Sequence, residues 1–320
     1  MNHAHEESRR DVLANFSGVF SALAAAATWG LGLVAIKASI GDVEAAPGYL
    51  AVQLASSLTA LVAAAVLTRR PILPNNGRLG FTFGTGILEY ALAYGLMIVG
   101  LGLTSVTNAA LIGASEPILI AVMAWVILRE PFDRSLRLAI LVSALGLGLV
   151  VTPDIALTGM TPAAIGDLLI LAGAAAGAAY AVASRHLLHK TNALTIAIAQ
   201  QLAGLGALVA ALAVLRVVAP GTVQLPTLSQ MPSAILTGIL VHGVAVWLHL
   251  HALRRMSAGM FSTYLALVPV FAIAAASLFL GEQLTILELV GSALLIAAVA
   301  GAQAGHMSSP KAKEKAHVHA

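Results

Sequence analysis

The sequence contains no cysteine and very little charge. Its 320 residues include no Cys, and Asp, Glu, Lys and Arg together make up 10% of the chain, whereas a soluble domain carries about 25%. Without cysteine there is neither a disulfide framework nor a thiolate metal site, and the redox compartment stays open. Apolar residues take the place of charge and reach 59%, with a mean hydropathy of +0.92. This composition excludes an ordinary soluble domain and indicates an integral membrane protein.

Catalytic and nucleotide-binding signatures are missing too. The chain has no Walker A loop, no HExxH, no GxSxG and no Rossmann glycine pattern. We therefore predict that the protein is not an enzyme, that it has no cofactor, and that any transport is driven by gradients. His249 and His251 point to opposite sides of a helix, so no metal site is predicted there. Whether the histidines of the tails bind metal is left open.

Ten apolar segments follow one another with short connections. A spanning helix needs roughly 20 apolar residues, and backbone groups in lipid must be paired within the segment, so helices are predicted. Polar tails are expected at residues 1–12 and 306–320, both disordered and cytoplasmic. The segments run over 13–36, 49–68, 79–101, 105–128, 136–152, 164–184, 193–217, 232–253, 257–280 and 285–304.

Lysine and arginine predict the orientation of these helices. Cytoplasmic loops of membrane proteins are enriched in both. With both termini in the cytoplasm, 15 of the 17 basic residues fall on the inner side, and Lys37 and Arg216 do not. We expect snorkelling to account for Lys37 at the outer end of its helix. This distribution also explains the net charge of +3 without a nucleic-acid partner. Membrane lipid is the expected neighbour.

An internal repeat divides the chain into residues 13–152 and 153–305. Each half would hold five helices, and an odd number makes the second half inverted relative to the first. Inverted repeats place a binding site at their interface near the middle of the membrane. Small residues such as those of the GxxxG pairs Gly80/Gly84 and Gly173/Gly177 are interpreted as helix packing. The repeated positions are Ser105, Pro117, Glu130 and Thr85-Gly86, which recur 152 residues later as Ser257, Pro269, Glu282 and Thr237-Gly238, and Lys37 and Gln53, which recur 148 residues later as Arg185 and Gln201.

These motifs resemble the EamA-type branch of the drug/metabolite transporter superfamily. Trp29-Gly30 followed by Lys37 is similar to its first-helix pattern. Ser115-Glu116-Pro117 and Leu267-Val268-Pro269, each followed 13 residues on by Glu130 or Glu282, resemble its most recognisable signature. The resemblance implies a transporter of amino acids, other metabolites or drugs, largely outward. Two departures concern the substrate: Gln53 and Gln201 stand where relatives often carry arginine, and the eighth helix carries His242, His249 and His251.

Two carboxylates lie in the middle of predicted spans. A charged residue there is costly and by default a functional candidate. Glu116 either titrates with protons or binds a substrate amine, or it satisfies backbone groups freed by Pro117. Glu89 has no acidic counterpart in the second repeat, where Val241 stands, so the repeat does not require it.

Further candidates for the substrate or proton pathway surround these carboxylates. His242 is the repeat partner of Tyr90 and is expected near Glu89, either in a proton relay or as a neutral hydrogen-bonded histidine. Tyr90 and Tyr94 share a helix face and either contact ligand or pack. The set is completed by Tyr264, Asn108 and Trp29.

The repeated motif also supplies structural candidates. Pro117 and Pro269 are predicted to bend their helices. Glu130 and Glu282, at opposite membrane faces, are interpreted as gate or loop anchors.

The sequence therefore predicts a secondary transporter in a cell membrane, with a bacterial inner membrane expected. It would export a small metabolite, such as an amino acid or an amphipathic compound, by alternating access, with proton coupling as a hypothesis from the titratable residues. A membrane-embedded enzyme and a passive channel are the alternatives. The substrate, the direction and the oligomeric state are not fixed by the sequence.

Overall fold

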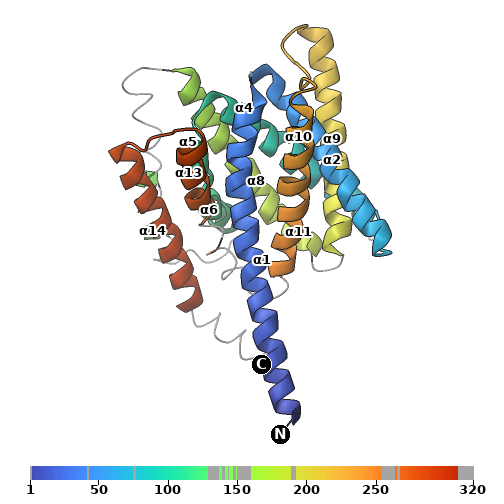
Figure 1. Cartoon of the computed structure of the whole chain (residues 1–320), viewed down its shortest axis with the longest axis vertical. Helices are drawn as coiled ribbons and strands as arrows, with labels where there is room; N and C mark the ends of the chain where they lie inside the picture. The colour runs from blue at the N-terminus through green and yellow to red at the C-terminus, as the bar shows by residue number, and fades with distance from the viewer. Residues whose placement is uncertain are drawn as a thin grey trace.

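A computed structural model describes residues 2–41, 43–74, 77–128, 137–138, 141–142, 144–146, 149, 160–188, 192–253, 264 and 267–308. In these parts the chain is helical, and the helices run roughly along the long axis of the molecule (Figure 1). The first half comprises α1 (Asn2–Ile40), η1 (Val43–Ala45), α2 (Ala46–Leu67), α3 (Leu79–Gly86), η2 (Ile87–Ala93), α4 (Tyr94–Leu103), α5 (Val106–Gly113) and α6 (Glu116–Leu128). The second comprises α8 (Pro162–Leu188), α9 (Ala193–Val218), α10 (Met231–Thr237), η3 (Gly238–Val244), α11 (Ala245–Leu253), α13 (Val268–Phe279) and α14 (Ile286–Ser308).

The described helices agree with the predicted all-α membrane architecture. Six are long and apolar enough to cross a membrane, and shorter apolar helices occupy three further predicted segments. The fifth predicted segment, 136–152, lies largely outside the described residues. The six long spans are Ser17–Ile40, Val43–Leu67, Leu79–Leu103, Pro162–Ser184, Leu194–Val218 and Met231–His249.

The first helix is longer than the sequence predicts. We expected a disordered tail over residues 1–12, but α1 begins at Asn2 and extends beyond the bundle at the lower end of Figure 1. Ala, Glu and Arg are good helix formers, so this polar stretch continues the helix that the apolar span begins.

The third and eighth predicted helices are not continuous α-helices. Each contains a π-helical segment of seven residues, η2 between α3 and α4 and η3 between α10 and α11. Shifting Ile87 by the repeat offset leads to Ile239, so the two segments correspond within one residue. A π segment loosens the regular hydrogen-bond ladder, and such segments are frequent at functional sites.

The two proline motifs coincide with the starts of half-helices. The predicted helix over 105–128 is divided, because α5 ends at Gly113 and α6 begins at Glu116. Pro117 is the second residue of α6, and Pro269 lies in the first turn of α13. The first turn tolerates proline because its N–H groups have no partner within the helix. The chain therefore breaks just before Pro117, and α13 begins one residue before Pro269.

Contacts between the halves follow a pseudo-two-fold pattern. Helix α1 packs against α11 and α13 of the second half. Its repeat partner α8 packs against α4 and α6 of the first half. These contacts correspond, because α4 and α11 belong to the third and eighth predicted spans, and α6 and α13 to the fourth and ninth. Likewise α2 packs against η3, and its partner α9 packs against α3 and η2. Each half thus buries its helices against the other, and the core lies at their shared interface.

Corresponding helices run in opposite directions. Near the start of α2, the backbone N–H of Gln224, beyond the end of α9, donates to Glu44 O at 3.0 Å. Near its end, Thr195 at the start of α9 donates from Oγ1 to Pro71 O at 2.6 Å. Helices α2 and α9 are therefore antiparallel, as an inverted repeat requires.

Two equivalent hydrogen bonds join the halves. Gln53 Nε2 donates to Thr237 Oγ1 at 2.9 Å, and Gln200 Nε2 donates to Thr85 Oγ1 at 2.9 Å. Thr85 and Thr237 are repeat partners, so the structure pairs Gln53 with Gln200 rather than with Gln201. Gln201 instead donates to His242 O at 3.1 Å. The buried glutamines thus hydrogen-bond between helices, as polar side chains within membrane spans commonly do.

The glycines that permit close helix approach are not those of the GxxxG pairs. A Cβ on Gly86 would lie 2.5 Å from Gln200 Cα, and one on Gly238 would lie 2.6 Å from Gln53 Cα. No atom lies within 4 Å of a Cβ built on Gly80 or Gly84. The packing interpretation of Gly80 and Gly84 was therefore wrong, because their side of α3 faces away from the bundle.

Candidate functional site

A cavity of about 440 Å³ lies between the two halves. It is lined by residues of α1, α2, η2, α4, α5 and α6 from the first half and of α8, α9, η3, α11, α13 and α14 from the second. Its size is within the usual range of small-molecule sites, roughly 300–1,000 Å³. Most lining side chains are apolar, and the polar or titratable ones are Gln53, Glu89, Tyr90, Tyr94, Glu116, Tyr180, Ser184, Gln200, His242 and His249.

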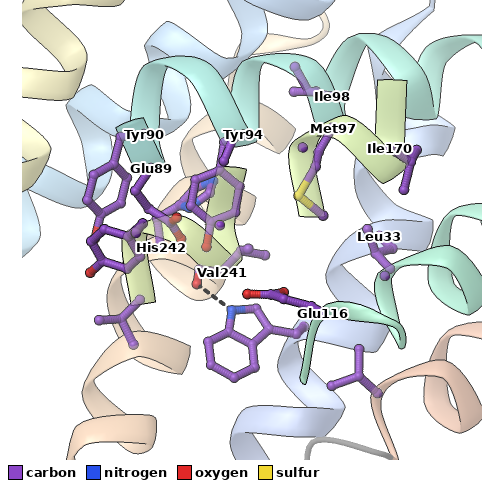
Figure 2. A pocket seen from close by; sticks show the side chains of 18 of the residues that line it. Leu33, Glu89, Tyr90, Tyr94, Met97, Ile98, Glu116, Ile170, Val241 and His242 are labelled. Atoms are coloured by element: carbon purple, nitrogen blue, oxygen red, sulfur yellow. Dashed lines mark hydrogen bonds between the residues drawn. The ribbon is translucent and has the colours of Figure 1, made fainter. Parts of the chain in front are cut away.

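Both mid-span glutamates line this cavity. Glu89 is carried by the π segment η2, and Glu116 is the first residue of α6, directly after the break. A Cβ built on Gly177 would lie 3.3 Å from Glu116 Oε1 and 3.6 Å from Glu89 Oε2. The two carboxylates therefore both lie close to one glycine of α8, and Figure 2 shows them facing the same space.

Gly177 and Gly173 differ in role although they form one GxxxG pair. A Cβ on Gly173 would meet the backbone of η2, with Ala93 O at 2.9 Å, which fits the packing interpretation. The three atoms nearest a Cβ on Gly177 all belong to the two glutamates. The packing interpretation of Gly177 was therefore wrong, since this glycine makes room for carboxylates and not for a helix.

The aromatic candidates gather beside Glu89. The rings of Tyr90 and Tyr94 lie 5.8 Å apart, and the Tyr94 and His242 rings meet edge to face at 4.6 Å. His242 is buried, with 2% of its surface exposed. Its Nδ1, like Glu89 Oε2, is buried and has no hydrogen-bond partner among the described residues. Unpaired buried polar atoms cost free energy, so these two face a cavity that a polar ligand would satisfy.

Trp29 of α1 also lines the cavity and is bonded to the second half. Its Nε1 donates to Val241 O at 3.2 Å, the bond dashed in Figure 2. Val241 lies within the π segment η3, whose irregular ladder makes a carbonyl available to a side chain. The Trp29 ring also meets the His249 ring edge to face at 5.7 Å.

Sequence reasoning missed a polar group from α8 and α9. Tyr180 Oη donates to Gln200 Oε1 at 3.1 Å, and Gln200 Nε2 also donates to Ser184 Oγ at 3.2 Å. All three residues line the cavity. One signal was available: Tyr180 and Ser184 are polar and one helical turn apart within an apolar span.

Two sequence candidates lie elsewhere. Asn108 Nδ2 donates to Asp167 Oδ2 at 3.1 Å, and Thr104 Oγ1 donates to Asp167 Oδ1 at 2.5 Å. Tyr264 packs against the buried pair Ala22 and Ala252. Neither Asn108 nor Tyr264 is among the described residues that line the cavity. Asp167 is fully buried, and the sequence analysis overlooked it although it is a carboxylate within a span.

Glu282 accepts three hydrogen bonds at the start of α5. Its oxygens accept from the N–H groups of Val106 and Thr107 and from Thr107 Oγ1, each at 2.9 Å. A carboxylate at a helix N-terminus accepts hydrogen bonds from the free N–H groups and interacts favourably with the positive end of the helix dipole. Its repeat partner Glu130 lies outside the described residues.

Lys37 does more than snorkel. Its ammonium group donates to Leu101 O, Gly102 O and Thr104 O at 2.7, 3.0 and 2.8 Å. It therefore caps the C-terminus of α4, where a cation is favoured. Lys37 and Glu282 fix the two sides of the short α4–α5 connection at the upper end of the bundle (Figure 1).

The arrangement is suited to binding and not to covalent chemistry. Two neighbouring carboxylates provide negative charge, aromatic and aliphatic side chains provide an apolar wall, and the helices around them are broken or loosened at η2, η3 and before α6 and α13. Discontinuous helices at the interface of inverted repeats are typical of transporter sites.

Comparisons with known proteins agree with this geometry. The profile of the EamA-like transporter family matches residues 16–152 and 164–302, one copy in each half. Among solved structures 25 chains match. One crystal structure of a protein has a TM-score of 0.61 and 18% identity, covering 93% of this chain and 99% of its own. That likeness shows the fold alone. No curated protein matches. The two family matches cover most of the chain, and the protein belongs to the EamA-like transporter family, whose members are membrane transporters and not enzymes.

Proposed function

We propose that the chain is a secondary transporter that exports a small amphipathic metabolite by alternating access between its two halves. The observation that carries the proposal is the cavity at the interface of the repeats, with Glu89 and Glu116 as neighbours beside Gly177. A site at this interface becomes open to one side or the other when the halves rock against each other. Membership of a transporter family supports the same conclusion.

The proposal includes ten helices, with both termini in the cytoplasm of a bacterial inner membrane. The basic residues of the connections favour this orientation. In it, the α4–α5 connection with Lys37 and Glu282 lies on the outer side. We place a gate there, because Glu282 of the second repeat caps a helix of the first.

Protons are the proposed coupling ion. Protonation of Glu89 or Glu116 and binding of a cationic substrate would exclude each other, because both neutralise the same carboxylates. A proton gradient would then drive export as the protein alternates between proton-bound and substrate-bound forms. Tyr90, Tyr94 and His242 would line this shared path.

Flux in proteoliposomes tests the proposal. A metabolite screen of cells that overexpress or lack the protein would supply the substrate, and its flux would be followed under an imposed pH gradient. We expect saturable, gradient-driven flux and counterflow, lost in Glu116→Gln and Glu89→Gln. The matched control is Glu44→Gln, since the Glu44 side chain is exposed outside the cavity. Unimpaired proton-coupled flux in both cavity variants would refute the roles assigned to Glu89 and Glu116. Unsaturable flux without counterflow would indicate a channel.

A further inference from the structure

The pseudo-two-fold symmetry relates two differently built parts of the cavity lining. In one part Glu89 and Glu116 lie beside Gly177. The repeat offset of 152 leads from these glutamates to Val241 and Val268, and Trp29 of α1 donates from Nε1 to Val241 O. All six residues line the cavity. We call Glu89, Glu116 and Gly177 the acidic subsite, and Val241, Val268 and Trp29 the apolar subsite.

The exchange concerns space as well as charge. In the apolar subsite the indole of Trp29 fills space and donates to the backbone of Val241. In the acidic subsite the missing side chain of Gly177 leaves room beside the two carboxylates. The halves therefore share a backbone frame and line it with opposite chemistry.

The charges of the lining limit the ligands that fit. Among the described lining residues there are two carboxylates and neither lysine nor arginine. Lys37, at the end of α1, is engaged with three carbonyls and is not one of them. A cationic nitrogen would find a partner in the acidic subsite. A ligand carboxylate would be removed from water beside two carboxylates, with no cation among the described lining residues to pair it, which is strongly unfavourable.

We propose that the cavity selects amphipathic monoamines: molecules with one cationic nitrogen, an apolar aryl or branched alkyl body, and no carboxylate. The nitrogen lies between Glu89 and Glu116 beside Gly177, and the body lies against Trp29 and the aliphatic wall. Figure 2 shows part of this wall, with Leu33, Met97, Ile98 and Ile170 gathered on one side of Glu116. This inference rests on the proposed transport function and names its substrate class, excluding ordinary amino acids.

Three compounds with one skeleton test the charge rule. We would measure binding of 2-phenylethylamine, phenylalanine and 3-phenylpropionate to the purified protein in lipid nanodiscs at pH 7.5, by calorimetry against empty nanodiscs. 2-Phenylethylamine is cationic at this pH. Phenylalanine adds a carboxylate to the same skeleton, and 3-phenylpropionate has a carboxylate in place of the amine. We expect the amine to bind at least tenfold more tightly than phenylalanine and the acid not to bind. Equal or tighter binding of phenylalanine, binding of the acid, or no binding of the amine would each overturn the proposal.

Variants locate the nitrogen. Gly177→Ala would place a methyl group 3.3 Å from Glu116 Oε1 and is expected to weaken amine binding several-fold, whereas Gly84→Ala, with open space around its Cβ, should not. Glu89→Gln and Glu116→Gln should weaken it at least tenfold, with Glu44→Gln as control. Unchanged amine affinity in Gly177→Ala and both cavity glutamate variants would contradict the placement.

The outcomes separate this inference from the transport proposal. Gradient-driven, Glu116-dependent flux of a zwitterion or an anion would agree with the transport proposal and would refute the monoamine substrate class. Amine binding with the expected preference but without flux of any bound compound would refute the transport mechanism instead.

Discussion

The glycine contacts that join the halves predict a large difference between two neighbouring substitutions in α3. We consider Gly86→Ala and Gly84→Ala, which add the same methyl group to one helix. A Cβ on Gly86 would lie 2.5 Å from Gln200 Cα, whereas one on Gly84 would meet no atom within 4 Å. Carbon atoms are normally about 3.5–4.0 Å apart at contact, so α3 and α9 would have to separate by roughly 1 Å.

The two energies follow from these contacts. Overpacking typically costs about 1–3 kcal/mol, and the upper end applies to Gly86 because the opposing atoms are backbone and cannot rotate away. Replacing a helical glycine by alanine contributes about 0.5–1 kcal/mol in the other direction. We therefore expect Gly86→Ala to lose about 2 kcal/mol of unfolding free energy and Gly84→Ala to gain up to about 1 kcal/mol.

Unfolding by SDS in detergent micelles, followed by circular dichroism, measures both variants. Gly238→Ala is a second test, because its Cβ would lie 2.6 Å from Gln53 Cα in the equivalent contact. Unfolding curves of Gly86→Ala and Gly238→Ala that coincide with that of Gly84→Ala would refute the assigned interface between the halves.

Two other predictions concern one end of the bundle and the orientation. Glu282→Ala removes the acceptor of three hydrogen bonds at the start of α5 and should lower the unfolding free energy by about 0.5–2 kcal/mol, while Glu44→Ala should not; equal stability of the two variants would disprove the cap. The chain has no cysteine, so a single introduced cysteine reports on which side of the membrane it lies. Thr68 and Ser229 are both exposed in connections between helices, and we expect an impermeant maleimide added to intact cells to label Ser229→Cys and not Thr68→Cys. The reverse labelling pattern would show that the orientation is inverted.

Hydropathy predicted the all-helical membrane fold and the repeat predicted the two halves, because both depend on properties that extend over many residues. An apolar span of roughly 20 residues reports a helix whatever its neighbours are. The repeat offset also predicted that Glu89, Tyr90 and His242 lie at one interface. All of them line the cavity, together with Trp29, Tyr94 and Glu116.

The features that sequence reasoning missed depend on local geometry or on single contacts. The π segments η2 and η3 add less than one residue per turn and leave the hydropathy pattern unchanged. Gly177 and Gly173 share one motif, yet one faces carboxylates and the other faces backbone. Asn108 is a polar residue inside a span, but its amide donates to Asp167 and it is not among the described residues that line the cavity.

Accessibility of a cavity residue from both sides tests alternating access most directly. Ala114 lines the cavity between α5 and α6, and Ala65 is fully buried outside it. We would label Ala114→Cys and Ala65→Cys with an impermeant thiol reagent, in right-side-out and in inverted membrane vesicles. The account predicts that Ala114→Cys reacts in both preparations and is protected by bound substrate, while Ala65→Cys reacts in neither. Reaction of Ala114→Cys from one side only, under every gradient applied, would contradict it.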